Sequence, residues 1–163
     1  MLFRSVPTAV FVTLRVATTG DLRGCVGSIE ASRPLGDAVV WAARAAAFRD
    51  GRFDPLAEVE LDRIRLDVSA LSPLAPLPVR DEADAISQLA RRRPGVVFQD
   101  GRRRSVLLPQ VWDALPDPAE FLRHLKLKAG LPPTFWSPSV QLDVFTCEEF
   151  AEGDGHIGRQ PVS

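Results

Sequence analysis

The stretch LRGCVGS, residues 22–28, carries one cysteine, Cys25, which follows Arg23 by two positions and lies between Gly24 and Gly27. Residues two apart in a regular strand point to the same face, and a nearby cation stabilises a thiolate. The glycines would let a substrate approach the backbone and would expose N–H groups to an anion. The pattern therefore predicts a site where Cys25 and Arg23 bind or activate an anionic or carbonyl-bearing group. The alternative is that Cys25 is a small buried residue in a strand that bends at its glycines.

A second candidate segment is the loop of residues 49–56, RDGRFDPL. Phe53 can anchor such a loop, and loops held on a rigid scaffold often line binding sites. Asp50 and Arg52 would then place charge beside a ligand, and a carboxylate here could act as an acid or base only where the cleft desolvates it. The alternative is a surface loop whose arginine and aspartate side chains pair with each other.

The remaining titratable and sulfur-bearing residues form no recognisable motif. His124 is expected on the surface of a helix, His156 in the C-terminal tail, and Cys147 stands alone. A pairing of Cys25 with His124 stays open, although no spacing supports it. The sequence has no paired metal-ligand spacing, phosphate-binding glycine loop or dinucleotide fingerprint, so we predict no metal and no cofactor.

Two arginine triplets, residues 91–93 and 102–104, flank a predicted hairpin strand. They could contact phosphate or RNA as one surface, but a strand of about 17–20 Å would hold them apart. The net charge is −1 and the sequence has no tyrosine, whereas RNA-binding surfaces combine basic and aromatic side chains. We therefore expect solvated charge at the triplets and no nucleic-acid partner.

The first half of the chain is predicted to form strands with one helix packed against them. Alternation of apolar and polar residues predicts strands over 8–16, 22–29 and 63–70. An alanine-rich helix, capped by Ser32 and ending near Phe48, would pack tightly on the sheet.

The second half begins with a proline-rich extended connector over 71–79. Asp81 and Asp117 are predicted to be helix N-caps, and Gly130 is predicted to end a helix as a left-handed C-cap. The predicted elements are helices over 82–92 and 118–129, a hairpin of strands 96–99 and 105–108, a strand over 139–146, and a short terminal helix capped by Thr146 and Glu149.

This mixture of helices and strands, with at least two hairpins, indicates an α+β fold with a mainly antiparallel sheet. A length of 163 residues with 45% hydrophobic content suits one domain with its own core. The domain is expected over 1–152, followed by a flexible tail over 153–163. The sequence shows no membrane-spanning run, no good signal peptide and no disulfide framework, so we expect a cytoplasmic protein without a membrane partner.

Five segments, in this order and spacing, resemble the AMMECR domain family. They are LRGCVGS (22–28), FRDGRFDPL (48–56), LDVSALSPL (66–74), LLPQVWD (107–113) and FLRHLKLKAGLP (121–132). The resemblance implies an α+β domain with a larger and a smaller subdomain and a cleft near the glycine–cysteine strand. It implies no established reaction. Bacterial and archaeal members often accompany a MEMO-like protein and a radical-SAM protein, which are therefore the expected partners.

Two features depart from the family pattern. The chain starts almost at its first strand, without the family's usual preceding helix, so a truncated start or a partner that covers this face is expected. Lys126 stands where relatives often have a second cysteine, so a mechanism that needs two family cysteines would fail here. Ser69, on the polar side of its strand, and Gln110, at a strand end, lie in matching segments and are further candidates for the cleft.

Three functions follow from these patterns. The leading hypothesis is a small-molecule enzyme or enzyme component that acts with MEMO-like and radical-SAM proteins. The second is a non-catalytic protein-binding scaffold, and the third is RNA binding through the arginine triplets. For the leading hypothesis, the predicted catalytic residues are Cys25 and Arg23, and the predicted substrate-binding residues are Gly24, Gly27, Asp50, Arg52, Phe53, Ser69 and Gln110.

Overall fold

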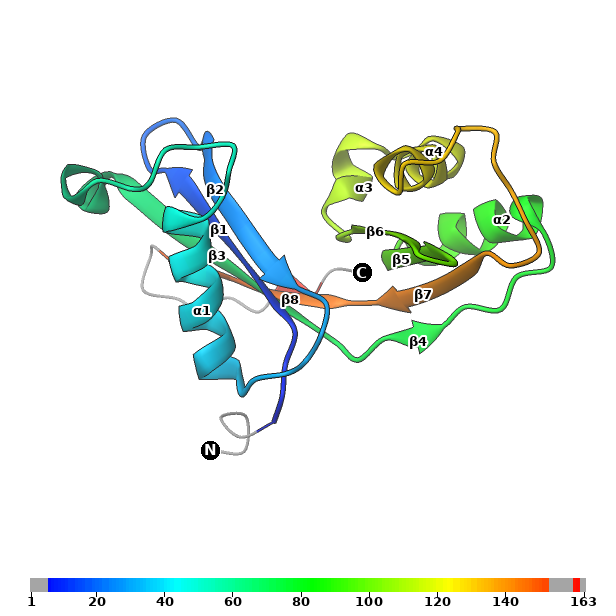
Figure 1. Cartoon of the computed structure of the whole chain (residues 1–163), viewed down its shortest axis with the longest axis horizontal. Helices are drawn as coiled ribbons and strands as arrows, with labels where there is room; N and C mark the ends of the chain where they lie inside the picture. The colour runs from blue at the N-terminus through cyan, green and yellow to red at the C-terminus, as the bar shows by residue number, and fades with distance from the viewer. Residues whose placement is uncertain (1–5, 153–159, 162–163) are drawn as a thin grey trace. The chain divides into compact units, whose positions relative to one another are not determined.

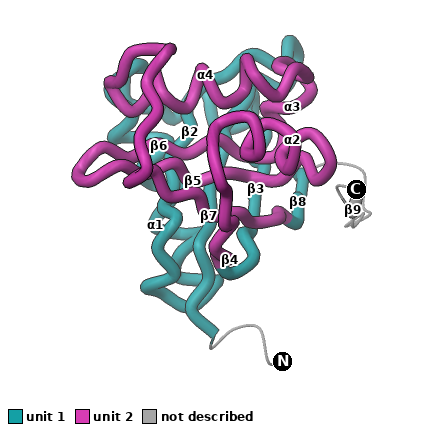
Figure 2. Tube along the Cα trace, turned by 90° about the vertical axis from the view of Figure 1, so that its right-hand side faces the viewer, with its two compact units in different colours: residues 1–73, 148–163 teal, residues 74–147 magenta. Residues whose placement is uncertain are grey.

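The computed structural model describes residues 6–152 and 160–161. The chain divides into two compact units, residues 1–73 with 148–163 and residues 74–147 (Figure 2). Each unit contains a sheet with packed helices, and the strand pairs β1–β2, β1–β3, β5–β6 and β5–β7 are all antiparallel (Figure 1). The predicted α+β fold with a mainly antiparallel sheet is therefore confirmed.

The first unit is built on a sheet in the order β2-β1-β3-β8-β9. β1 lies between β2 and β3, so Val12 is opposite Val26 on one side and Val68 on the other. The β1–β2 register shifts between Leu14, which faces Gly24, and the next residue, which faces Leu22. The strands are β1 (Val10–Val16), β2 (Leu22–Ser28), β3 (Ile64–Leu71), β8 (Cys147–Ala151) and β9 (Gln160–Pro161).

Helix α1 (Leu35–Phe48) covers one face of this sheet (Figure 1). Its buried positions are alanines, and Ala42 and Ala46 pack in one cluster with Val12 and Leu14 of β1. Small side chains let the helix backbone approach the strands closely, as predicted. A short 3₁₀ helix, η2 (Glu58–Arg63), follows α1 and leads into β3.

The second unit contains a sheet in the order β4-β7-β5-β6. The strands are β4 (Ala75–Pro76), β5 (Gly95–Asp100), β6 (Arg103–Leu107) and β7 (Gln141–Phe145), and the helices are α2 (Glu82–Arg92), α3 (Val111–Ala114) and α4 (Pro118–Lys128). Its core is made of larger side chains than that of the first unit, and Trp112 stacks on Phe121 with ring centroids 3.8 Å apart. The predicted proline-rich connector, residues 71–79, contributes its first residue, Leu71, to β3 and otherwise forms only the edge strand β4, in keeping with the missing N–H of proline.

Three predicted helix ends of the second unit are confirmed. Asp81 accepts a hydrogen bond of 2.8 Å from the backbone N–H of Asp84, and Asp117 accepts one of 2.9 Å from that of Ala119. Gly130 follows α4 with a φ of 77°, a backbone conformation that costs glycine little. The two aspartate side chains satisfy N–H groups that the first turn of a helix leaves without partners.

Two predicted helix starts are wrong. Pro34, not Ser32, precedes α1, because its extended ψ of 149° keeps the backbone out of the helical region until Leu35. Thr146 and Glu149 cap no helix, since residues 147–151 form β8 next to β3. Pairing within a sheet satisfies backbone groups along the whole segment, and this outweighs a local capping signal.

Most of the predicted flexible tail over 153–163, with His156, lies outside the described residues. Gln160–Pro161 forms β9 and pairs with Glu148 and Glu149 of β8. Among the described helices, none is long and apolar enough to cross a membrane.

Candidate functional site

Strand β2 lies at one edge of the first unit's sheet, and the loop after α1 supplies a partner to its outer side. The backbone N–H of Cys25 donates a hydrogen bond of 2.9 Å to Oδ2 of Asp50. An edge strand leaves alternate N–H groups without a neighbouring strand. Here a side-chain carboxylate takes that place, so the predicted residues Cys25 and Asp50 lie together.

Asp50 also holds Arg52. Its two oxygens accept hydrogen bonds from the backbone N–H of Arg52 at 3.1 Å, from Nε at 3.0 Å and from Nη2 at 2.7 Å. These bonds from the Arg52 side chain, with those from the two backbone N–H groups, hold the pKa of Asp50 well below its usual range although burial opposes the shift. The Asp50 carboxylate is therefore ionised at neutral pH, which suits it to position other groups rather than to carry protons.

The thiol of Cys25 is half-buried and belongs to a row of polar side chains across three strands. Thr13 of β1 is opposite Cys25 on one side and opposite Asp67 of β3 on the other. Oγ1 of Thr13 donates a hydrogen bond of 3.4 Å to Sγ of Cys25. Asp67 pairs with Arg15 through Oδ2 at 3.3 Å, while its Oδ1 is buried without a hydrogen-bond partner. Cys25 therefore has a hydroxyl donor beside it, although no histidine of the described residues contacts it.

The two glycines of the motif are explained by packing. A Cβ at Gly24 would overlap the backbone carbonyl of Ala46 in α1. A Cβ at Gly27 would overlap the ring of Phe11 and the carbonyl oxygen of Val10 on β1. Both positions are filled by this unit's own atoms, so the missing side chains let other parts of the fold approach β2.

Arg23 is the extra residue at the register shift between β1 and β2. A bulge of this kind re-aims a side chain, and Arg23 pairs with Glu60 of η2 through Nε at 2.8 Å and Nη2 at 3.1 Å. Oε2 of Glu60 also accepts the backbone N–H of Ala57 at 2.7 Å. This pairing raises the pKa of Arg23 and lowers that of Glu60. The third guanidinium nitrogen, Nη1, is buried without a hydrogen-bond partner.

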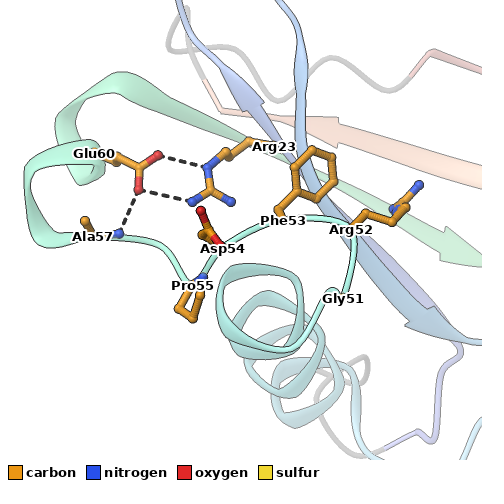
Figure 3. Close-up of a pocket in the computed structure, with 8 residues that line it drawn as sticks. All are labelled: Arg23, Gly51, Arg52, Phe53, Asp54, Pro55, Ala57 and Glu60. Atoms are coloured by element: carbon orange, nitrogen blue, oxygen red, sulfur yellow. Dashed lines mark hydrogen bonds and ion pairs between the residues drawn. The ribbon is translucent and has the colours of Figure 1, made fainter.

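An open pocket of about 680 Å³ lies beside this ion pair (Figure 3). Phe53 lies near both predicted arginines, with its ring centroid 5.9 Å from Cζ of Arg23 and 5.5 Å from Cζ of Arg52. Asp50 and Cys25 do not line this pocket; Asp50 is linked to it through Arg52, and Cys25 only through its bond to Asp50. The lining residues are Arg23, Gly51, Arg52, Phe53, Asp54, Pro55, Ala57 and Glu60.

The principal residue missed from the sequence is Glu60. It lies 37 positions after Arg23, in the segment 57–62, to which no sequence motif assigns an element or a role. No signal in one sequence predicts that pair, because it depends on where the bulge directs Arg23 and where η2 lies. Ala57 and Pro55, which contribute backbone and shape, were also missed.

Two predicted cleft residues lie away from this pocket. Ser69 is buried on β3, opposite Phe11 of β1, and does not line the pocket. Gln110 belongs to the second unit, where it precedes α3. Neither residue is brought beside Cys25 by the hydrogen bonds described above, so their part in a site stays a prediction.

Other candidates of the second unit take part in local structure. Nδ1 of His124 lies 2.9 Å from the carbonyl oxygen of Glu120 on the same helix. Arg93 donates to the carbonyl of Pro116 at 3.4 Å, and Arg103 to that of Gly130 at 3.0 Å. Among the residues that the structure describes, no three His, Cys, Asp or Glu side chains gather as metal ligands would.

Comparison with known proteins gives one consistent result. The AMMECR1 family model matches residues 3–150. Protein MK0488 of Methanopyrus kandleri is 40% identical over 150 residues, which cover 88% of this chain and 70% of the relative. A protein of Methanothermobacter thermautotrophicus is 42% identical over 149 residues, 88% of this chain and 74% of the relative. The crystal structure of the uncharacterized protein PH0010 from Pyrococcus horikoshii matches with a TM-score of 0.85 at 32% identity, over 99% of this chain and 83% of that one.

Proposed function

Because the chain belongs to the AMMECR1 family, we propose that it is a small-molecule enzyme or enzyme component whose site lies on β2 and the loop after α1. The observation that carries the proposal is the position of Asp50. Its single carboxylate lies 25 positions after Cys25 and holds both the backbone of Cys25 and the side chain of Arg52. Relatives' names state no activity, so the proposal rests on this geometry.

In the proposed site, Cys25 is the reactive group and the two arginines hold the substrate. The thiol is half-exposed and has Thr13 as a donor to sulfur, and a cysteine that acts as a nucleophile needs such partial exposure. Arg23 and Arg52 line the adjacent pocket, where an anionic or carbonyl-bearing group would meet guanidinium donors. Asp50 is a positioning residue, because it keeps its negative charge and acts through Cys25 and Arg52.

The proposal includes partners in the cytoplasm, namely a MEMO-like protein and a radical-SAM protein. Support for them comes from the family resemblance and not from a contact surface. Tagged chain co-expressed with both proteins from the same genome should retain at least one of them through purification. Purification of the chain alone from that co-expression would remove this part of the proposal.

The test of the reactive thiol is alkylation of the folded protein in a Cys147→Ala background. Cys147 is buried, so its removal leaves one thiol to follow. We expect iodoacetamide to label Cys25 under native conditions, at a rate that Asp50→Asn changes and Asp62→Asn, on an exposed residue outside the pocket, does not. Labelling that requires prior unfolding would overturn the enzyme proposal.

One observation favours the alternative of a protein-binding scaffold. Val59 and Leu61, on either side of Glu60 in η2, are 76% and 57% exposed, and exposed apolar residues often mark interaction sites. Replacing both residues by serine should leave Cys25 labelling unchanged. Loss of the co-purifying partners in the double variant, together with no native labelling of Cys25 in the otherwise unchanged protein, would favour the scaffold function over the enzyme function. RNA binding has less support, since Arg93 and Arg103 are already bonded within their own unit.

A further inference from the structure

The pocket beside Arg23 has one charged group that the protein leaves without a partner. Arg23 is neutralised by Glu60, and Arg52 by Asp50. Asp54 lines the same pocket and is exposed, and it makes no hydrogen bond or ion pair with the residues the structure describes. Its carboxylate affects Arg23 only through space. The pocket therefore presents a carboxylate that is near Arg23 but that no hydrogen bond with the described residues occupies.

The same pocket also keeps one open guanidinium arm. Arg52 is 58% exposed and uses Nε and Nη2 on Asp50. Its Nη1 makes no bond with the described residues and is left to donate. In Figure 3 the Arg52 and Asp54 side chains lie on opposite sides of Phe53, and all three residues line the pocket. A negative and a positive recognition group are thus held two positions apart on one loop.

We propose that this pocket binds a small zwitterion, with its ammonium group on Asp54 and its carboxylate on the free arm of Arg52. A purely anionic ligand would meet two guanidinium groups that are already neutralised, together with the unpaired carboxylate of Asp54, and like charges repel. A purely cationic ligand would leave the open arm of Arg52 unused. This inference rests on the proposed function, because it names the substrate class of that site.

Phe53 completes the recognition surface. Its ring lies within 6 Å of both arginines, at 5.9 Å from Cζ of Arg23 and 5.5 Å from Cζ of Arg52. Cations stack on the face of an aromatic ring, so Phe53 holds both guanidinium groups in place. The carbon chain that joins the two charges of a zwitterion would lie along this residue. The distance between those charges is therefore the property that the pocket selects.

The experiment is an NMR titration of the full chain with small probes of known charge. Glycine, β-alanine and γ-aminobutyrate vary the separation of ammonium and carboxylate, while acetate and methylammonium carry one charge each. Because the paired groups are exposed, affinities of about millimolar are expected. We expect one of the three zwitterions to bind at least about fivefold more tightly than acetate or methylammonium, with shifts at the amides of residues 51–57. Acetate binding as tightly as every zwitterion, or no binding by any probe, would overturn the assignment.

A matched pair of variants locates the ammonium site. Asp54→Asn should weaken zwitterion binding about tenfold, the size expected for a charge-assisted hydrogen bond, and should strengthen acetate binding. Asp62→Asn removes the same charge from η2 outside the pocket and should change neither affinity. If both variants behave alike, the ammonium does not bind Asp54. Native labelling of Cys25 is measured in a separate experiment. The proposal of a zwitterionic ligand can therefore be rejected while the proposal of a reactive thiol stands, and the reverse also holds.

Discussion

The two units use their cationic side chains differently. In the second unit, Arg93, Arg103 and Lys128 donate to backbone carbonyls at 3.4, 3.0 and 2.7 Å. In the first unit, Arg23 and Arg52 are each held by two hydrogen bonds to a carboxylate. The first use joins one segment of backbone to another, and the second builds a charged cluster around a pocket.

The span of the ion pairs shows the same difference. The surface pairs of the second unit, Arg80–Asp84 and Arg123–Glu120, join residues four and three apart. Of the three described pairs of the first unit, Arg23–Glu60 and Arg15–Asp67 join residues 37 and 52 apart, whereas Arg52–Asp50 joins residues two apart. Isolated surface pairs contribute little to stability, so the long-range pair of Arg23 on the edge strand β2 suggests a function beyond stability. The comparison favours the first unit as the place of the proposed chemistry.

The largest loss of stability is expected from changes at Lys126, a buried cation of the second unit that pairs with a carboxylate. Lys126 is 1% exposed and bonds to Glu82 and to the carbonyl of Pro133. Lys126→Ala should lower the free energy of unfolding by about 3 kcal/mol, because it leaves a cavity and unpaired polar groups. Lys126→Met restores the volume and should recover most of that loss, and the exposed Lys128→Ala should cost below about 1 kcal/mol. Urea unfolding measures all three, and an Ala variant as stable as wild type would show that the second unit does not depend on its cation.

The next effect is expected where α1 meets β2 in the first unit. Gly24→Ala should cost about 2–3 kcal/mol, since the new Cβ overlaps the carbonyl of Ala46. Gly36→Ala is the control, because Gly36 is helical and has open space where a Cβ would lie. That change should stabilise by up to about 1 kcal/mol. Thermal unfolding of both variants checks this, and a neutral Gly24→Ala would mean that the helix can move away without loss.

A smaller and pH-dependent effect is expected for Asp50→Asn. The variant should lose about 1–2 kcal/mol at pH 7, because its amide replaces a charged acceptor of four hydrogen bonds. The folded state lowers the pKa of Asp50. The ionised carboxylate therefore stabilises the fold fully above the unfolded-state pKa of about 3.9, and this stabilisation is lost progressively as the pH falls below that value. The difference in free energy of unfolding between wild type and variant, measured by urea unfolding, should be constant above about pH 5 and should narrow below about pH 4. A gap that widens in acid would contradict the sign, and Asp62→Asn should show no gap at either pH.

The smallest effect is expected at the row of side chains across β2, β1 and β3. Thr13→Val removes the hydroxyl that donates to Sγ of Cys25. Native labelling of Cys25 should slow about two- to threefold, which corresponds to a weak hydrogen bond of ~0.5 kcal/mol. Thr18→Val, in the exposed turn between β1 and β2, should leave the rate unchanged. Equal rates for both variants would show that the thiol does not depend on its hydroxyl neighbour.

Much of the fold could be predicted because its signals are local. The alternation in β1 and β3, the caps Asp81 and Asp117, and the glycine after α4 each depend on residues close in sequence. β8 was missed because its structure depends on a neighbouring strand far away in the chain, while Thr146 and Glu149 carry a capping pattern that β8 overrides. Local preference decides an element only where no distant partner competes.

The candidate site could be predicted only in part, for the same reason. Cys25, Arg23, Asp50 and Arg52 were found because each lies in a short segment with an unusual composition. The pairing of Arg23 with Glu60 could not be found, since it follows from a bulge that a single sequence does not mark. The glycines were explained by an overlying helix and a neighbouring ring, which become visible only when the sheet is assembled.

The carboxylate of Asp50 has a consequence for how copies of this chain behave in a crowded solution. It occupies the place on the outer side of β2 where the carbonyl of a further strand would bond. Open strand edges recruit other chains and seed aggregates. One aspartate in a loop thus closes the sheet to addition of a second copy, and acid strong enough to neutralise that aspartate reopens it. The same bond that holds the backbone of Cys25 therefore also covers one open N–H group of the edge strand.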